Sequence, residues 1–283
     1  MEGDPASAAA QIPRTIWFTW FQGLEHAPEL VRRCHESWRA QNPGWRLVTL
    51  DETSLAEFAS LDYGRGALAG QSPNHRSNVL RLELLARHGG VWADATCLCA
   101  RPLDDWLAPC LPSGFFAFRR PRGERLLSSW FLAAEPGNHL VGALFERMRD
   151  YWCRHSFRDS PRLRELLTRR LGRSPSRRAL WFSPPVRDVL RVAPYFALHY
   201  GFEKLLREDA EAARIWAQTP SVSADPPHGP LRQGLHEPVS DAVREDVDRG
   251  ETPVYKLTWK LGDRPPAPGS VLAYLFASAG VLP

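Results

Sequence analysis

One short stretch of the sequence places a carboxylate where a ligand could reach it. Asp94 follows Gly89-Gly90 and the apolar run Val91-Trp-Ala, so a buried strand is predicted to carry it out at its end. Side chains two positions apart on a strand share a face, so Asp94 and Thr96 are predicted to point the same way. Oxygen ligands suit hard cations such as Mg²⁺ and Mn²⁺, but a hydroxyl is a much poorer ligand than a carboxylate. The alternative is that Asp94 only caps the following turn.

Lysine is rare in this chain, and two of the lysines lie close together. Of the 36 Lys and Arg residues, only those at 204, 256 and 260 are lysine. Lys256 and Lys260 both belong to the run Val254-Tyr-Lys-Leu-Thr-Trp-Lys260. An ammonium is a compact charge and a guanidinium a planar fork, so the run indicates positions that favour the compact charge, for example against phosphate oxygens. The alternative is that both lysines flank a surface strand or loop.

The elements that would position these residues follow an α/β pattern. The β-rich run 15–21 predicts a buried first strand. The apolar spacing over 28–41 predicts a helix, and the run 45–50 predicts a second strand. The stretch 74–88 predicts a helix that ends at the double glycine, and 91–93 predicts a third buried strand. Strand, helix, strand is the unit of a parallel sheet, and ligands bind outside the carboxyl ends of such strands. Asp94 is predicted to lie at that edge.

The rest of the chain is less specific. Further apolar runs span 115–118 and 130–133, an amphipathic helix is predicted over 139–152, and loops are predicted over 220–230 and 262–269. Nine arginines fall between 154 and 178, namely those at 154, 158, 162, 164, 169, 170, 173, 177 and 178. Such a segment is usually a solvated face, and the alternative is a docking surface for anionic lipid headgroups or a phosphate-bearing acceptor.

Composition limits the class of protein. A chain of 283 residues with 43% hydrophobic and 24% charged residues can bury a substantial core, which excludes a disordered or fibrous protein. A net charge of +4 suits small anionic ligands better than nucleic acid, so no nucleic-acid partner is expected. Five cysteines without a disulfide framework indicate reduced thiols and a cytoplasmic location. Residues 1–10 are expected to be a flexible leader, and no run is long enough to span a membrane, so any membrane contact would be peripheral, at the inner face.

Taken together, these motifs resemble the donor-binding core of glycosyltransferases, in which S-D-x-x-R, G-G and an apolar strand ending in D-x-D follow one another. The opening Ile12-Pro-Arg-Thr-Ile-Trp-Phe-Thr-Trp-Phe-Gln-Gly23 resembles their first nucleotide-binding strand, and Val254 to Lys260 resembles a C-terminal K-L-T-W/Y-K element. The chain is most similar to the capsular polysaccharide synthesis proteins, relatives of glycosyltransferase family 32. The resemblance covers residues 11–107 and 253–260 and the middle only loosely.

The resemblance implies an α/β fold of GT-A type, a single domain over 11–283 with a mainly parallel nucleotide-binding sheet flanked by helices. Residues 11–110 would bind the nucleotide sugar and 111–283 would shape the acceptor side. The implied activity is transfer of a hexose-like sugar, with retention, from a nucleoside diphosphate sugar to a glycan or other hydroxyl acceptor in polysaccharide or glycoconjugate synthesis. The implied catalytic residue is Asp94, with Asp94 and Thr96 as ligands of Mn²⁺ or Mg²⁺. The implied donor contacts are Trp17, Trp20, Asn78, Arg81, Gly90, Asp94, Lys256 and Lys260.

The sequence departs from the family pattern at two positions, and two alternatives stay open. Thr96 stands where the D-x-D of glycosyltransferases has its second carboxylate, although D-A-T fits the capsular subfamily. Asn78 replaces the acid of S-D-x-x-R, so any cation site is expected to be weaker than usual. The loss of the carboxylate also suits a non-catalytic protein that binds a nucleotide sugar or a glycan. A glycoside hydrolase would instead pair Asp94 with Asp51, Glu52 or Asp104 across a sugar cleft.

Overall fold

A five-stranded sheet forms the centre of the protein. The structure is a computed structural model, which describes residues 12–122, 125–260 and 264–281. β1 (Thr15–Thr19) lies between β2 (Arg46–Leu50) and β3 (Gly90–Ala93) and pairs with both in parallel. β6 (Arg125–Ala134) pairs antiparallel with β3, and β5 (Phe115–Arg122) pairs antiparallel with β6. All strands except β6 therefore run in one direction, and the predicted mainly parallel α/β sheet is confirmed.

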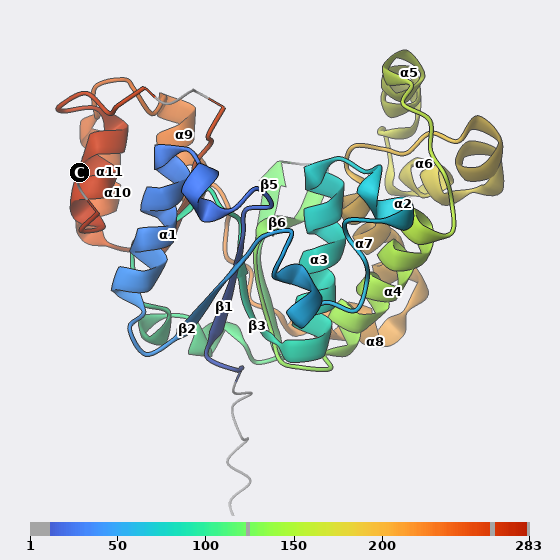
Figure 1. Cartoon of the computed structure of the whole chain (residues 1–283), viewed down its shortest axis with the longest axis horizontal. Helices are drawn as coiled ribbons and strands as arrows, with labels where there is room; N and C mark the ends of the chain where they lie inside the picture. Colours follow the sequence, from blue (N-terminus) through green and yellow to red (C-terminus); the bar gives the residue numbers. More distant parts are fainter. Residues whose placement is uncertain (1–11, 123–124, 261–263, 282–283) are drawn as a thin grey trace, which may run out of the picture.

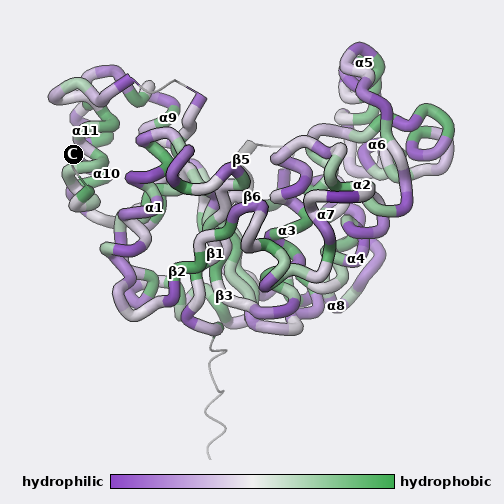
Figure 2. The backbone as a smooth tube through the Cα atoms, viewed as in Figure 1, coloured by the Kyte–Doolittle hydropathy of each residue, from purple (hydrophilic) through white to green (hydrophobic). Residues whose placement is uncertain are grey.

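The two faces of the sheet are covered by different parts of the chain (Figure 1). On one face Trp17 and Trp92 pack against the helices α3 (Pro73–His88), α4 (His139–Cys153), α7 (Ala197–Glu208) and α8 (Ala210–Gln218). On the other face Ile16 and Phe18 pack against Trp38 of α1 (Glu29–Gln41). This alternation along β1 is the period of two that a strand buried on both faces requires. Figure 2 shows hydrophobic residues along the strands and hydrophilic ones in the surface loops.

A second, two-stranded sheet joins the middle of the chain to its C-terminal part. β4 (Cys97–Cys99) pairs antiparallel with β7 (Val254–Lys256), with Cys97 opposite Lys256. The N–H of Leu257 extends this pairing by donating to the carbonyl of Thr96 over 2.8 Å. Leu98 and Tyr255, which pair with each other in this ladder, pack with Leu272 of α11 (Val271–Ser278). The ladder therefore brings residues near position 256 to the segment that follows β3.

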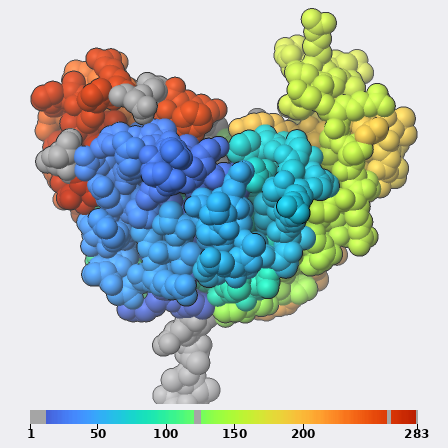
Figure 3. Space-filling model, in the orientation of Figure 1, coloured from blue at the N-terminus to red at the C-terminus, as the bar shows by residue number. Residues whose placement is uncertain are grey.

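The remaining helices are short or peripheral. They are α2 (Gly66–Ala69), α5 (Pro161–Leu171), α6 (Pro175–Arg178), α9 (Gly229–Gln233) and α10 (Asp241–Arg249), with the 3-10 helices η1 (Leu24–His26), η2 (Leu55–Glu57), η3 (Leu103–Asp105), η4 (Ala108–Cys110), η5 (Ala179–Phe182) and η7 (Pro226–His228), and the π-helix η6 (Pro185–Leu190). In Figure 1, α5 projects from the body on the side opposite α11. Figure 3 shows a broad depression between these two parts, over the edge to which the carboxyl ends of β1, β2 and β3 point.

Most predicted elements are confirmed, and the differences have local causes. The helix predicted over 74–88 begins one residue earlier, at Pro73, because Ser72 caps it by accepting a hydrogen bond from the N–H of His75. The loop predicted over 220–230 contains η7 and the start of α9. The expected leader, 1–10, and part of the loop at 262–269 lie outside the described residues. Among the residues that the structure describes, no helix is long and apolar enough to cross a membrane.

Candidate active site

Asp94 lies directly after the central strand β3, in a turn. Its N–H donates to the carbonyl of Trp130 on β6 over 2.8 Å, and its own carbonyl accepts from the N–H of Cys97 over 2.8 Å. The strand thus ends before Thr96, and the strand geometry predicted for 94–96 is wrong because this turn joins β3 to β4. The carboxylate is 26% exposed, which leaves it accessible to a ligand at the carboxyl edge of the parallel strands.

Arg81 from α3 holds one oxygen of this carboxylate. Its Nη2 lies 3.1 Å from Asp94 Oδ1, and its guanidinium lies over the ring of Trp92, 5.1 Å from the centroid. The same side chain donates through Nε to the carbonyl of Ser77 over 3.1 Å and through Nη1 to the carbonyl of Ser129. Arg81 is 3% exposed, so these contacts fix its orientation. The expectation that Arg81 serves this site rather than solvent gains support from its burial.

Lys256 from β7 contacts the other oxygen. Its Nζ lies 3.3 Å from Asp94 Oδ2 and donates to Thr96 Oγ1 over 2.5 Å. The lysine comes from a strand more than 150 residues further along the chain, and the β4–β7 ladder places it here. The structure therefore brings Arg81, Asp94, Thr96 and Lys256 together, and we refer to these four residues as the Asp94 cluster.

Electrostatics keeps the charged groups of the Asp94 cluster ionised. Burial alone would raise the pKa of Asp94, but the charges of Arg81 and Lys256 and the hydrogen bonds from Trp92 and Lys256 outweigh it and lower that pKa. Burial alone would lower the pKa of Lys256, and the carboxylate of Asp94 outweighs it and raises that pKa. With Asp94, Arg81 and Lys256 all ionised, the cluster carries a single net positive charge, which suits an anionic ligand.

A small polar cavity lies next to Arg81. Its volume is about 130 Å³, and it is lined by Asn74, Asn78, Arg125, Ser129, Tyr195, Phe196 and His199. Ser129 is the residue whose carbonyl accepts from Arg81, which places the cavity beside the cluster. The ring nitrogen Nδ1 of His199 is buried, and none of the described residues forms a hydrogen bond with it. Burial, together with the charges of Arg125 and Arg81, lowers the pKa of His199 to about 3, so its ring is neutral at pH 7.

Two tryptophans meet where β1 ends. The rings of Trp20 and Trp259 contact each other edge to face, with centroids 5.9 Å apart. Trp259 is 46% exposed, and it lies three residues beyond Lys256. A partly exposed aromatic pair at the carboxyl edge of a sheet can stack against a planar ligand group. The prediction that Trp20 contacts a nucleotide stays a prediction, and the structure adds Trp259 to it.

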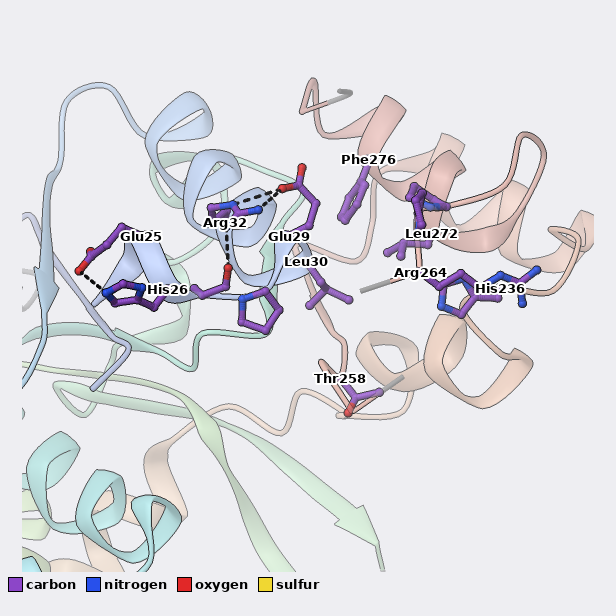
Figure 4. A pocket seen from close by; sticks show the side chains of 14 residues that line it. Glu25, His26, Glu29, Leu30, Arg32, His236, Thr258, Arg264, Leu272 and Phe276 are labelled. Carbon is purple, nitrogen blue, oxygen red and sulfur yellow. Dashed lines mark hydrogen bonds and ion pairs between the residues drawn. The ribbon is translucent and has the colours of Figure 1, made fainter. Parts of the chain in front are cut away.

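A larger cavity lies between the start of α1 and the C-terminal elements (Figure 4). Its volume is about 630 Å³, and Arg32, Glu29, Leu272, Phe276 and Thr258 are among its lining residues. In Figure 4 Arg32 is already bound to Glu29 and to the carbonyl of Ala27. Neither cavity is lined by Asp94. The smaller cavity is the more informative one, because Asn78 and Ser129 connect it to the Asp94 cluster.

Besides Trp20 and Asn78, three more of the expected donor contacts lie outside the Asp94 cluster. Trp17 is 3% exposed, and its indole N–H donates to the carbonyl of Gly89 over 2.8 Å on the helix-covered face, so it is a core residue. Gly90 begins β3, at the end of the strand opposite Asp94, and a Cβ there would lie 2.5 Å from the carbonyl oxygen of Thr15. Gly90 therefore serves strand packing. Lys260 is exposed and forms no ion pair within the described part of the chain.

The residues around Asp94 do not fit a divalent cation. Water and substrate phosphate can supply several of the six or more oxygen ligands of a hard cation, but the protein itself offers only one carboxylate and one hydroxyl, and Lys256 Nζ already contacts both. A cation placed there would also face two positive side chains. Across residues 12–122, 125–260 and 264–281, no group of three or more His, Cys, Asp or Glu side chains is arranged to hold a metal.

The carboxylates that a hydrolase would pair with Asp94 are engaged elsewhere. Asp51 accepts from the hydroxyl of Thr53 over 2.7 Å and from the N–H of Ser54 over 2.9 Å, and these hydrogen bonds close a local turn and lower the pKa of Asp51 to about 2. Glu52 binds Arg76 over 2.9 Å. Asp104 binds Arg14, which precedes β1 at the amino end of the sheet, over 2.9 Å. These contacts weigh against the hydrolase alternative.

Sequence reasoning missed two participants. Trp92 donates through Nε1 to Asp94 Oδ1 over 2.9 Å, although the sequence suggests only a core residue. The two-residue spacing from Asp94 is a signal that could have revealed it. His199 lies more than 100 residues from the motif in sequence, and only the packing of α7 brings it to the small cavity.

The first part of the chain matches a known protein family. A family model described as capsular polysaccharide synthesis protein matches residues 4–159, more than half of the chain. The match includes Arg81 and Asp94 but ends long before Lys256.

Two of the similar proteins carry glycosyltransferase names. The glycosyltransferase afumC of Aspergillus fumigatus is 30% identical over 158 residues, which cover 49% of this chain and 40% of that protein. The O-glycosyltransferase braB of Annulohypoxylon truncatum is 26% identical over 162 residues, which cover 49% of this chain and 38% of that protein. The chain thus matches less than half the length of these relatives. Among solved structures, PaToxG glycosyltransferase aligns over 84% of this chain and 85% of its own, with 14% identity and a TM-score of 0.41.

Proposed function

The chain belongs to the family of capsular polysaccharide synthesis proteins, and we propose that it is a glycosyltransferase that uses a nucleoside diphosphate sugar as its donor. The observation that carries the proposal is the Asp94 cluster, in which Arg81 and Lys256 flank one carboxylate at the carboxyl edge of the parallel strands. Family membership and the relatives' names support the reaction class. The net positive charge of the cluster supports a diphosphate as the group bound there.

In the proposed reaction the bond between the sugar and the diphosphate breaks as a bond to the acceptor oxygen forms. Negative charge then develops on the departing phosphate oxygen, and Arg81 and Lys256 are positioned to stabilise it. Transfer with retention is part of the proposal, with the acceptor on the face that the diphosphate leaves. The acceptor proton would pass to the leaving phosphate oxygen, so no separate general base is required.

The neighbouring features support positions for the rest of the donor. The small cavity beside Arg81 offers Asn78 and His199 to sugar hydroxyl groups. The Trp20–Trp259 pair offers an aromatic surface to the nucleotide base. The GT-A type of the sheet and the division into a nucleotide half and an acceptor half at residue 110 belong to the same proposal. The acceptor would be a capsule repeat, a lipid-linked glycan or a small natural product with a free hydroxyl.

The basic segment supports a peripheral contact with an anionic membrane. Arg162, Arg170, Arg173 and Arg177 are exposed on or near α5 and α6. Exposed large apolar residues cluster in the same part of the chain, at Leu166, Leu180, Val189 and Leu190. Basic and apolar groups together suit a lipid surface. Arg178, which was expected on this face, is not part of it because it is buried against Glu203.

The test measures whether the protein binds UDP-, GDP-, CDP- and TDP-sugars, and whether it releases the nucleoside diphosphate from each of them. Binding with release in the presence of acceptor would support the proposal. Binding of a donor without release under any condition would favour the alternative, a non-catalytic nucleotide-sugar protein. If the protein cleaves a glycan without any nucleotide present, the hydrolase alternative is favoured instead.

A further inference from the structure

We propose that the ammonium of Lys256 takes the position and the electrostatic role of a divalent cation, so that donor binding and transfer need no metal. This inference rests on the proposed function, since it concerns how the diphosphate of the donor is neutralised. It departs from the expectation of a weakened Mn²⁺ or Mg²⁺ site at Asp94 and Thr96.

The position of the ammonium carries the first step. A cation held by D-x-D would lie between the side chains at 94 and 96. Here Lys256 Nζ contacts both of them, Thr96 Oγ1 at 2.5 Å and Asp94 Oδ2 at 3.3 Å. An ammonium has three N–H donors, and these two contacts leave one for a ligand oxygen. The side chain is 18% exposed, so a ligand can reach it.

The backbone holds the lysine in this position. β7 pairs with β4 so that Lys256 lies opposite Cys97, and the N–H of Leu257 donates to the carbonyl of Thr96. These contacts fix the lysine backbone against the turn that carries Asp94 and Thr96. The ammonium is therefore positioned by main-chain pairing before any ligand binds, as a preorganised electrostatic group requires.

The net charge of the Asp94 cluster is consistent with an ammonium in place of a divalent cation. Two carboxylates, one arginine and a divalent cation carry one net positive charge. Asp94, Arg81 and Lys256 carry the same net charge without any metal. The neutral Thr96 is needed for this balance, because a carboxylate at 96 would cancel the charge of Lys256. A neutral residue at 96 and a lysine at 256 are thus two parts of one arrangement, because each is needed for this net charge without a metal.

The consequences for variants are specific. Lys256→Met keeps the length of the side chain and removes its charge, so the diphosphate should lose a charged hydrogen bond. Lys204 offers a matched control, because it lies on α7 and pairs with Glu208, away from the cluster. Thr96→Asp should weaken diphosphate binding while Lys256 is present. In the double variant Thr96→Asp with Lys256→Ala, two carboxylates and an open position between them should create a site for Mn²⁺.

The experiment is titration calorimetry of UDP, GDP, CDP, TDP and their sugars into the full chain, in EDTA and in Mn²⁺, with turnover measured in parallel. The wild type and Lys204→Met should bind one of these nucleotides equally well in both solutions. Lys256→Met should bind it about tenfold more weakly or worse, as expected for a lost charged hydrogen bond. The double variant should bind it only with Mn²⁺.

Three outcomes would overturn the inference. The first is a wild type that binds and turns over only with Mn²⁺. The second is a Lys256→Met protein that binds like the wild type in EDTA. The third applies if Lys256→Met fails to fold, when Thr96→Asp is tested in its place. A folded Thr96→Asp protein that binds the nucleoside diphosphate in EDTA as tightly as the wild type would then overturn the inference. A wild type that binds no nucleoside diphosphate and no nucleotide sugar in either solution would instead overturn the proposed function, and this inference with it.

Discussion

The indole N–H of Trp92 donates to Asp94 Oδ1 over 2.9 Å, and the guanidinium of Arg81 lies over the same indole ring. One residue of β3 thus orients both the carboxylate at the strand's end and the cation that pairs with it. The carboxylate is held from three sides, by Trp92, Arg81 and Lys256. A change at Asp94 is therefore expected to disturb the orientation of both cations.

Asp94→Asn should leave the protein folded and remove most transfer activity. The amide keeps the shape of the side chain but cannot accept from Arg81, Lys256 and Trp92 together, so both cations lose their orientation. We expect turnover to fall by about two orders of magnitude, the effect of losing a preorganised electrostatic contact. The measurement is nucleoside diphosphate release, with Asp104→Asn, at the opposite edge of the sheet, as the control. Near-wild-type turnover of folded Asp94→Asn would refute the site.

Arg81→Lys should weaken donor binding more than it slows turnover. A lysine retains the charge but cannot contact Asp94, Ser77 and Ser129 at once, as the guanidinium does. We expect the KM for the nucleotide sugar to rise about tenfold, as for a lost charged hydrogen bond. Steady-state kinetics on the folded variant decides the matter, with Arg87→Lys on the same helix as the control. An unchanged KM would show that Arg81 has only a structural role.

His199 should make the protein less stable as the pH falls below 7. Its pKa is about 3 in the folded state and near the ordinary histidine value of 6.5 in the unfolded chain, so between these pH values the unfolded chain binds the extra proton. This part of the stability is complete above pH 6.5 and is lost as the pH falls toward 3. The slope for one such group is at most about 1.4 kcal/mol per pH unit. Urea unfolding at several pH values from 7 to 5 gives the free energy of unfolding as a function of pH. This free energy should change less with pH in His199→Gln than in the wild type, and an equal pH dependence would contradict the prediction.

Exposed arginines near α5 should bind anionic vesicles in a salt-dependent way. Replacing Arg162, Arg170 and Arg173 by Gln should weaken binding to phosphatidylserine vesicles at least about tenfold, since each basic residue near the surface contributes about 1 kcal/mol. Rising salt should release the wild type. The control replaces Arg39, Arg65 and Arg249, which are also exposed. Absence of binding at low salt would leave α5 as solvated surface.

Neighbouring arginines at 177 and 178 should differ sharply in their effect on stability. Arg178 forms two hydrogen bonds to Glu203, at 2.8 and 2.7 Å, and both side chains are nearly buried. Arg178→Met leaves a buried carboxylate without its partner, which costs about 3 kcal/mol or more of unfolding free energy. Arg177 is exposed, so Arg177→Met should stay within about 0.5 kcal/mol of the wild type. Denaturant titration compares the two, and equal stabilities would contradict the burial of Arg178.

Local signals in the sequence were enough for the frame of the site. The helix that carries Arg81 and the strand that delivers Asp94 follow from apolar spacing and a pair of glycines within twenty residues. The mainly parallel sheet follows from the order of strand and helix along the chain. These features depend on neighbours a few positions away, so the sequence alone determines them.

Only the tertiary structure decided which residues meet at Asp94. Trp17 and Trp20 lie three positions apart in one apolar run, yet the first is packed under α3 and the second meets Trp259 at the edge. Arg178 lies among nine arginines, and only Glu203 distinguishes it from Arg177. Lys256 reaches Asp94 through a strand pairing that spans more than 150 residues. Such contacts depend on which distant segments pair and which face of a strand is covered, and periodicity along the chain carries no information about either.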